Sequence, residues 1–474
     1  MKKLIFSLFI FLVLMGYGYT YDGGFGEYLK KEVSDFTEFK NQNDKEFYEY
    51  LKTSWKEFKS FLPLQRDKTP KIKKPPVIKD KRINLEKKEE KKVSDVGYIN
   101  QVDVTNKDKM PETFNMVVDE QKVDFYGIDI NLRNINYGRL ISEPITGDKI
   151  AEAWKILATY KDDSLVRQLR ENGSQKRLSD WSYFKLVKLV ADTLYPNNYN
   201  DRMILSWFLL SRLGFEVKVG YNSENIFLLV PSKQIIYGVQ FFNFNNVRYY
   251  VIWSQNRNIK NLYSYTLKHA ESEKIFLFDI KDRINSRYVQ KELSFYYDGK
   301  KYSFPVEYDI VTVDFYKDFP QTDLSVYYNA DISGRIIETV MEHLGKIIEG
   351  KDELDSVNMI LRFVQTAFAY KTDQEQFGYE KYFLPDETIH YPYSDCEDRS
   401  ILFAYLVRKL LGLKVILLEY PGHVATAVRF NNNVVGDKVI FNGEVYTVAD
   451  PTYINANVGM TMPQFKNVRP KGIF

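Results

Sequence analysis

The only cysteine of the chain, Cys396, lies where a predicted loop meets a run of residues that is apolar at helical spacing. Ser394 and Glu397 fit a capping box, with Asp395 as the alternative N-cap, so the thiol is expected at the start of a helix. Free backbone N–H groups there favour an anion and lower a thiol pKa from its ordinary value of about 8.5. The adjacent carboxylates oppose that shift, so the cysteine needs a basic partner.

A histidine and an aspartate follow the cysteine at equal spacings. After one predicted strand, His423 opens a second, and period-two alternation places it on the same face as Ala425 and Ala427. Asp450 ends a third predicted strand, as far beyond the histidine as the histidine lies beyond the cysteine. A nucleophile, a base and an orienting acid in this order are the components of a cysteine hydrolase or acyltransferase.

This arrangement resembles the transglutaminase-like superfamily of papain-like proteins over roughly residues 355–455. Asp-Pro-Thr at 450–452 matches the acid motif of the superfamily, and Asp-Cys-Glu-Asp at 395–398 is similar to its bacterial cysteine-proteinase branch. The resemblance implies a catalytic triad of Cys396, His423 and Asp450. Many members carry an aromatic residue two positions after the histidine, where this chain has Ala425, so peptidase and crosslinking transglutaminase both stay open.

An oxyanion formed at the thiol would be held by the backbone N–H of Cys396 and one further donor, for which Tyr391 and Tyr393 are candidates. Both tyrosines end a long aromatic-rich loop, residues 371–393. Long loops inside compact domains are often functional, and we expect this one to be a lid or substrate wall. The alternative is an ordered surface loop without substrate contact.

The other histidines are weaker candidates for the functional site, and so is a metal centre. His269 and His343 lie in polar contexts and are expected at the surface, whereas His390 is close enough in sequence to approach the site. Zinc binding by the cysteine, histidine and aspartate is chemically possible. Without a C-x-x-C or H-x-x-x-H pair, however, we predict no metal and no other cofactor.

The N-terminal part divides into three predicted segments. Residues 1–20 have a basic start and a short apolar core, which is typical of a secretory signal peptide. Residues 21–64 carry aromatic residues at helical spacing and predict an amphipathic helical arm. Residues 65–95 form a Lys- and Pro-rich linker, expected to be extended and solvated.

The remainder contains an internal repeat. Residues 201–210 match residues 398–407, which predicts a first transglutaminase-like copy at 96–280 and a second at 281–474. The first copy has Tyr199, Asn225 and Trp253 where the second has the triad, and none of these three can replace its counterpart in covalent acyl transfer. The first copy is therefore predicted to be degenerate, and the second to be the catalytic one.

These observations predict an α+β protein with two papain-like repeats, their accompanying β segments and a helical arm. The predicted function is peptide or isopeptide hydrolysis by an exported, periplasmic or secreted enzyme that acts on protein or peptide substrates of the cell envelope. An amine acyltransferase and a catalytically silent binding module are the alternatives. Outside the linker and signal the charge is negative, so nucleic acid is not an expected partner. No membrane span is expected after signal cleavage.

Overall fold

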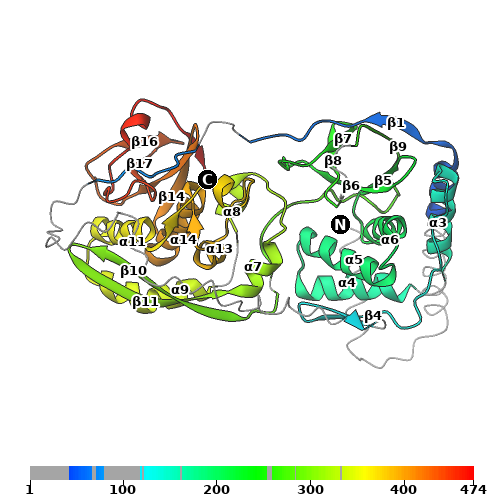
Figure 1. The fold of residues 1–474 in the computed structure, drawn as a ribbon, viewed down its shortest axis with the longest axis horizontal. Coiled ribbons are helices and arrows are strands. Elements are labelled where there is room, and N and C mark those ends of the chain that lie inside the picture. The colour runs from blue at the N-terminus through cyan, green and yellow to red at the C-terminus, as the bar shows by residue number, and fades with distance from the viewer. Residues whose placement is uncertain are drawn as a thin grey trace, which may run out of the picture.

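The structure is a computed structural model of the 474-residue chain. It describes residues 42–66, 71–78, 118–119, 122–160, 163–253, 259–282, 284–330 and 334–474. The predicted signal peptide and most of the predicted linker lie outside these ranges. The described residues form an α+β protein, as expected, and Figure 1 shows its two halves side by side.

In the first half, helices separate two sheets. Figure 1 shows α4, α5 and α6 between a six-stranded sheet above and a small three-stranded sheet below. The helices are α3 (Gly147–Thr159), α4 (Ser164–Lys176), α5 (Asp180–Leu194) and α6 (Tyr199–Arg212). The strands are β1 (Lys56–Lys59), β2 (Val118–Asp119), β3 (Lys122–Phe125), β4 (Ile128–Asn131), β5 (Lys218–Tyr221), β6 (Ile226–Ser232), β7 (Phe241–Phe244), β8 (Val247–Tyr250) and β9 (Asn261–Ser264).

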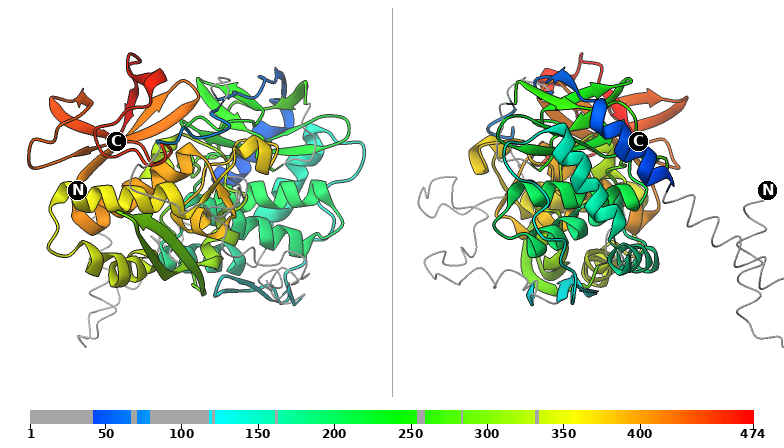
Figure 2. Two further views of the ribbon diagram at one scale, coloured as in Figure 1. Left: turned by 60° about the vertical axis from the view of Figure 1, so that its left-hand side comes forward. Right: turned by 90° about the vertical axis from the view of Figure 1, so that its right-hand side faces the viewer.

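The second half has a similar layering, with a five-stranded sheet, a central layer of helices and a long β10–β11 hairpin on the far side (Figures 1 and 2). The helices are α7 (Ile310–Tyr316), α8 (Leu324–Tyr328), α9 (Arg335–Val340) continued by a π-helical turn (Met341–Gly345) and α10 (Lys346–Ile348), α11 (Glu353–Ala367), α12 (Asp373–Gln376), α13 (Pro385–His390), α14 (Cys396–Leu411) and a 3-10 turn (Pro463–Phe465). The strands are β10 (Tyr288–Tyr297), β11 (Lys300–Asp309), β12 (Ala369–Tyr370), β13 (Tyr393–Ser394), β14 (Lys414–Tyr420), β15 (His423–Arg429), β16 (Lys438–Phe441), β17 (Glu444–Ala449) and β18 (Lys471–Ile473).

The two main sheets share one strand order. The first runs β9-β5-β6-β8-β7, with β1 added outside β9, and the second runs β18-β14-β15-β17-β16. In both sheets all neighbouring strands are antiparallel, and the strands correspond one to one in chain order. In both halves the helix that precedes the first of these strands, α6 or α14, packs on the sheet.

The described part of the segment predicted as a helical arm, residues 42–64, belongs to the first half, and residues 21–41 lie outside the described ranges. Residues 42–53 are helical, and the buried rings of Phe47 and Trp154 meet edge to face with centroids 4.8 Å apart. The blue helix lies beside α3 in the right-hand view of Figure 2. The helical prediction is wrong for residues 56–59, which form β1 and pair with β9. The free edge of the sheet offers these residues backbone partners, which overrides their helical spacing.

The linker prediction is also wrong in part. Residues 71–78 do not extend into solvent but lie on the second half. The N–H of Ile78 donates to the carbonyl of Ile454 at 2.9 Å, and the N–H of Ile454 donates to the carbonyl of Pro76 at 3.0 Å. The Tyr370 hydroxyl donates to the carbonyl of Ile72 at 2.6 Å. We call residues 71–78 the strap.

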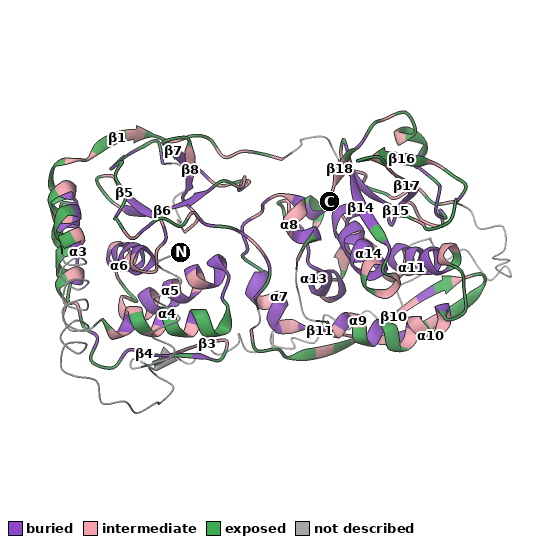
Figure 3. Ribbon diagram, turned by 180° about the vertical axis from the view of Figure 1, so that it is seen from behind, coloured by how far each residue is buried: buried purple, intermediate pink, exposed green. Residues whose placement is uncertain are grey.

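Burial is concentrated in the central helices and the sheets (Figure 3). Helix α14 is buried over its first three turns, and Gly412 ends it in the left-handed conformation (φ 67°), which glycine adopts without strain. Among the described residues, no helix has both the length and the apolar character needed to cross a bilayer.

Candidate active site

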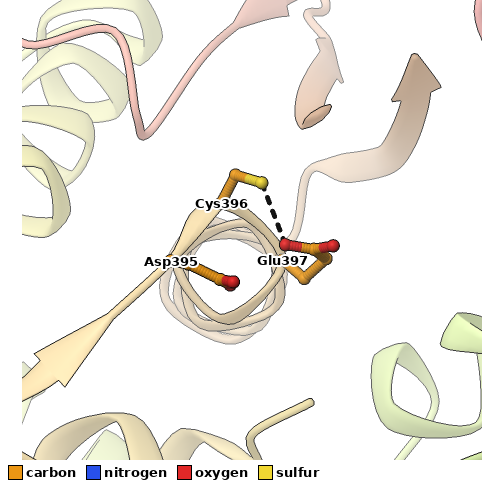
Figure 4. A group of neighbouring side chains, drawn as sticks. All are labelled: Asp395, Cys396 and Glu397. Carbon is orange, nitrogen blue, oxygen red and sulfur yellow. Dashed lines mark hydrogen bonds between the residues drawn. The ribbon is translucent and has the colours of Figure 1, made fainter. Parts of the chain in front are cut away.

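Cys396 is the first residue of α14, as the sequence predicts. Asp395 is the N-cap, and its backbone N–H donates to the Asp398 carboxylate at 3.0 Å. The structure thus selects the alternative cap, and Ser394 instead accepts a hydrogen bond from Arg399 Nε at 3.2 Å. The thiol is fully buried (0% exposed) and donates to Glu397 Oε2 at 2.9 Å, as Figure 4 shows.

His423 and Asp450 are hydrogen-bonded to each other. A two-residue turn, Pro421 followed by Gly422 (φ 68°), joins β14 to β15 and places His423 at the start of β15. Asp450 directly follows β17, the neighbour of β15. His423 Nε2 and Asp450 Oδ2 are 2.9 Å apart, and both side chains are buried. The sequence therefore predicted this pair correctly as a contact.

Several contacts hold this pair in place. Asp450 Oδ1 accepts from the backbone N–H of Thr452 at 2.9 Å and from that of Tyr453 at 3.2 Å. The His423 ring is stacked on Phe465, with ring centroids 5.1 Å apart and planes at 10°. His423 Nδ1 is buried and has no hydrogen-bond partner among the described residues. The nitrogen that does not face Asp450 is thus the one free to accept a proton.

The start of α14 is anchored beside the start of β15. Ser400, one turn after the cysteine, donates from its hydroxyl to the carbonyl of Val424 at 3.0 Å. A cleft of about 760 Å³ is bordered by both Glu397 and His423. The thiol of Cys396 donates to Glu397 in this structure, so a change of its side-chain rotamer is needed before it can donate to His423.

Lys71, from the strap, is the residue that sequence reasoning missed. Its ammonium lies 2.7 Å from Asp395 Oδ2, 2.7 Å from Glu380 Oε2, 3.1 Å from Glu397 Oε1 and 3.6 Å from Asp373 Oδ2. The only sequence signal for it was the need for a basic partner near the cysteine. The linker contains many basic residues, and its sequence does not distinguish this lysine from the others.

The carboxylates dominate the electrostatics of the thiol. Burial raises the pKa of Cys396 well above its usual value, and Glu397 and Asp395 raise it further, while Lys71 opposes them. The expectation of a thiol pKa below the ordinary value is therefore wrong for this arrangement. The helix start does favour an anion, but two neighbouring acids and complete burial outweigh it.

The charges of the acidic residues differ from one another. Burial acts to raise the pKa of Glu397, but Lys71 and hydrogen bonds outweigh it and lower this pKa to about 2. Burial and nearby carboxylates raise the pKa of Asp395 and of Asp398 well above the usual range, and burial raises that of Asp373 to about 7. Burial acts to lower the pKa of Lys71, but the nearby Glu397 and Asp395 outweigh burial, so the pKa of the lysine is raised. Glu397 and Lys71 therefore form the charged pair beside the thiol.

Two groups of side chains in this region have the spacing of metal ligands. Ligand atoms of Asp395, Cys396 and Glu397 lie within 4.8 Å of one another, as do those of Asp373, Asp395 and Asp398. The ammonium of Lys71 contacts members of both groups. We therefore assign Asp373, Asp395 and Glu397 as ion-pair partners of this lysine rather than as metal ligands.

The two tyrosines proposed for the oxyanion do not border the cleft. Tyr391 is stacked on Phe383, with ring centroids 4.8 Å apart, and Tyr393 lies under the ammonium of Lys371. Other residues of the aromatic-rich loop, including Thr372 and Tyr382, do border it, so the loop forms one of its walls. A sequence rich in aromatic residues indicates a packed loop but not which rings pack on each other.

The remaining histidines lie elsewhere. His390 Nδ1 is 3.1 Å from the hydroxyl of Tyr308, and His343 is half-buried against Phe304. The surface prediction for His269 is wrong, because it is 2% exposed and its Nε2 lies 3.0 Å from Asp44 Oδ1. The aspartate comes from the N-terminal helix, whose packing on this half could not be inferred from the local sequence.

The first half has no equivalent site at the matching positions. Tyr199 begins α6 as Cys396 begins α14, and its hydroxyl donates to the carbonyl of Trp253 at 3.2 Å. Asn225 directly precedes β6. A hydrogen bond thus joins Tyr199 to Trp253, and none of the three matching positions carries a thiol, imidazole or carboxylate.

Comparisons with protein-family models, with curated proteins and with solved structures find no match for this chain.

Proposed function

We propose that the protein is an exported, cysteine-dependent acyl-transfer enzyme of the transglutaminase-like type that hydrolyses peptide or isopeptide bonds. The observation that carries this proposal is the His423–Asp450 hydrogen bond of 2.9 Å, which leaves a buried, unpartnered Nδ1 on the histidine in the cleft next to the helix that begins at Cys396. An imidazole held in this way is arranged as a general base.

The proposed reaction begins when the thiol turns from Glu397 toward His423. Its proton passes to His423 Nδ1 as Sγ bonds to the carbonyl carbon of the substrate. Asp450 holds Nε2–H and stabilises the imidazolium. The leaving amine takes the proton, and the thioester is hydrolysed by water. The first backbone N–H groups of α14 are suited to hold the oxyanion.

The two halves are proposed to be copies of one transglutaminase-like unit. Their identical strand order and the matching positions of Tyr199 and Cys396 at a helix start support this duplication. The first copy would then support the second without reacting itself. The predicted signal at residues 1–20 supports export, with a protein or peptide of the cell envelope as substrate.

A catalytically silent binding module is the second candidate. It is favoured by the complete burial of the thiol and by its raised pKa. Amine transfer remains the alternative reaction, since a thioester can be resolved by water or by an amine.

The experiment uses the protein without residues 1–20, beside Cys396→Ala and, as a control for remote substitution, the exposed-pair variant Glu444→Gln. Each is given a mixture of peptide and isopeptide acyl donors with and without millimolar primary amine, and products are identified by mass spectrometry. We expect free acid from the wild type and from the control, and none from the alanine variant. Amide as the main product would replace hydrolysis by transfer. No product from a thiol that an electrophile still labels would favour the binding module.

A further inference from the structure

We propose that Lys71 is a positioning residue of the active site, and that the strap belongs to the catalytic unit rather than to a tether. Lys71 would hold Glu397 and offset its charge, so that the thiol of Cys396 can give up its proton to His423. This inference rests on the proposed function, although its test requires no turnover.

The geometry around the ammonium is the first argument. Four carboxylates, those of Asp373, Glu380, Asp395 and Glu397, have an oxygen within 4.0 Å of Lys71 Nζ, and the side chain of the lysine is only 12% exposed. An ordinary surface salt bridge joins one cation to one carboxylate and contributes little to the stability of the fold. Here a single lysine compensates a group of largely buried acids on both sides of the nucleophile.

The path from Lys71 to the thiol passes through Glu397. Glu397 Oε1 contacts the ammonium at 3.1 Å, whereas Oε2 accepts the hydrogen bond of the thiol at 2.9 Å. Among the described residues, Lys71 is the only cation within ion-pair distance of Glu397. The neighbouring cation Arg399 is directed elsewhere, toward the carbonyls of Gln365 and Phe368.

The strap is held where it can deliver this charge. The strap forms two backbone hydrogen bonds with Ile454. In addition, the carbonyl of Ile78 accepts a hydrogen bond from Asn455 Nδ2 at 2.9 Å. Ile454 and Asn455 follow Asp450 within the same loop. The strap thus contacts the segment that carries the acid of the proposed triad, while Lys71 and His423 border one cleft.

The charge balance explains why the lysine is needed. A thiolate at Cys396 would lie beside the anionic Glu397, and like charges at this distance strongly oppose ionisation. With Lys71 present, the charge of Glu397 is offset by the ammonium that it shares with Glu380, and the imidazolium of His423 balances the thiolate. The ionisable groups that interact with the thiol are Glu397, Asp395 and Arg399 of the α14 region, Lys71 of the strap and Tyr370 of β12. Asp373 and Glu380 contact the ammonium of Lys71, Asp398 accepts from the backbone N–H of Asp395, and His423 borders the cleft.

The test measures alkylation of Cys396, the only cysteine, by iodoacetamide from pH 5 to 10. The variants are Lys71→Met, Lys71→Arg and the double variant Lys71→Met with Glu397→Gln, each checked for thermal unfolding. Lys74→Met is the control, because Lys74 is an exposed lysine of the same strap.

Lys71→Met should raise the pH midpoint of alkylation by about one unit or more. For each unit by which the thiol pKa rises, the fraction of thiolate at pH 7 falls about tenfold. A more basic thiolate is also more nucleophilic, which offsets about a threefold part of this loss. The alkylation rate at pH 7 should therefore fall about threefold for each unit. In Lys71→Arg the midpoint should lie close to the wild-type value, because the charge is kept. In the double variant the midpoint should also lie near the wild-type value, because both charges are removed. Lys74→Met should leave it unchanged.

An unchanged midpoint in Lys71→Met would overturn the proposal. Faster alkylation at every pH with the same midpoint would also overturn it, because the strap would then only cover the thiol. If Lys71→Met does not fold, the double variant is compared with Glu397→Gln alone: a midpoint about one unit higher in the double variant supports a lowering of the thiol pKa by the charge of Lys71, and equal midpoints refute it. Absence of turnover in the wild type would count against the proposed function but would not alter these readings.

Discussion

Replacing Glu397 with glutamine should make the thiol of Cys396 more acidic. Glu397 Oε2 lies 2.9 Å from Sγ and accepts its proton, so the carboxylate favours the neutral thiol. After burial, it is the largest contribution that raises the pKa of this thiol. Glutamine has the same size and keeps an oxygen for the ammonium of Lys71, but it carries no charge.

The expected magnitude follows from this distance. A like charge within about 4–6 Å changes a pKa by roughly 1–3 units, so the midpoint of thiol ionisation should fall by at least about one unit. A lower pKa gives more thiolate at pH 7, about tenfold per unit, while the nucleophilicity of that thiolate falls about threefold. The net alkylation rate at pH 7 should therefore rise about threefold for each unit.

The assay is the pH dependence of iodoacetamide alkylation, followed by intact mass. Glu444→Gln is the matched control, because Glu444 is paired with Lys414 on the sheet and does not border the cleft. It should leave the midpoint unchanged. A midpoint that stays constant or rises in Glu397→Gln would refute the view that this carboxylate holds the thiol in its protonated form.

Two further predictions concern stability. Arg399→Met should lower the free energy of unfolding by about 3 kcal/mol or more in urea, because it removes the charged donor to two buried carbonyls, those of Gln365 and Phe368; a loss below about 1 kcal/mol would contradict this. Burial raises the pKa of Asp386 to about 7, so stability in the wild type should fall as the pH rises from about 4 to 7, where only the unfolded state loses this proton. Asp386→Asn should be more stable at pH 8, by up to about 4 kcal/mol, and its unfolding should depend less on pH; a stability loss at pH 8 would count against this.

The elements that carry the predicted triad could be derived from local patterns. The apolar spacing after Cys396 predicts α14, and the strand patterns predict that His423 begins β15 and that Asp450 directly follows β17. Both strands run through one antiparallel sheet, so their pairing follows once the strands are assigned. The His423–Asp450 contact could be predicted because its determinants lie within one short stretch of chain.

The features that were missed depend on contacts between distant segments. Lys71 is one of many basic residues in its run, and only the fold brings it to Glu397. Residues 56–59 form a strand because β9 has a free edge, which no spacing of aromatic residues indicates. His269 is buried because Asp44, far away in sequence, packs over it. Local periodicity contains no information about such partners.

The covalent connection of the strap has a consequence for how its lysine is retained. Arg66, just before it in the chain, lies between Tyr237 of the first half and Tyr382 of the second, 3.2 Å from the centroid of the Tyr382 ring. Docking of the strap is thus intramolecular, with an effective concentration that reaches millimolar values for short connections. A chain cut on one side of the strap would keep Lys71 in place. Cutting on both sides would turn the strap into a separate peptide, and the acidity of the thiol would then change on dilution.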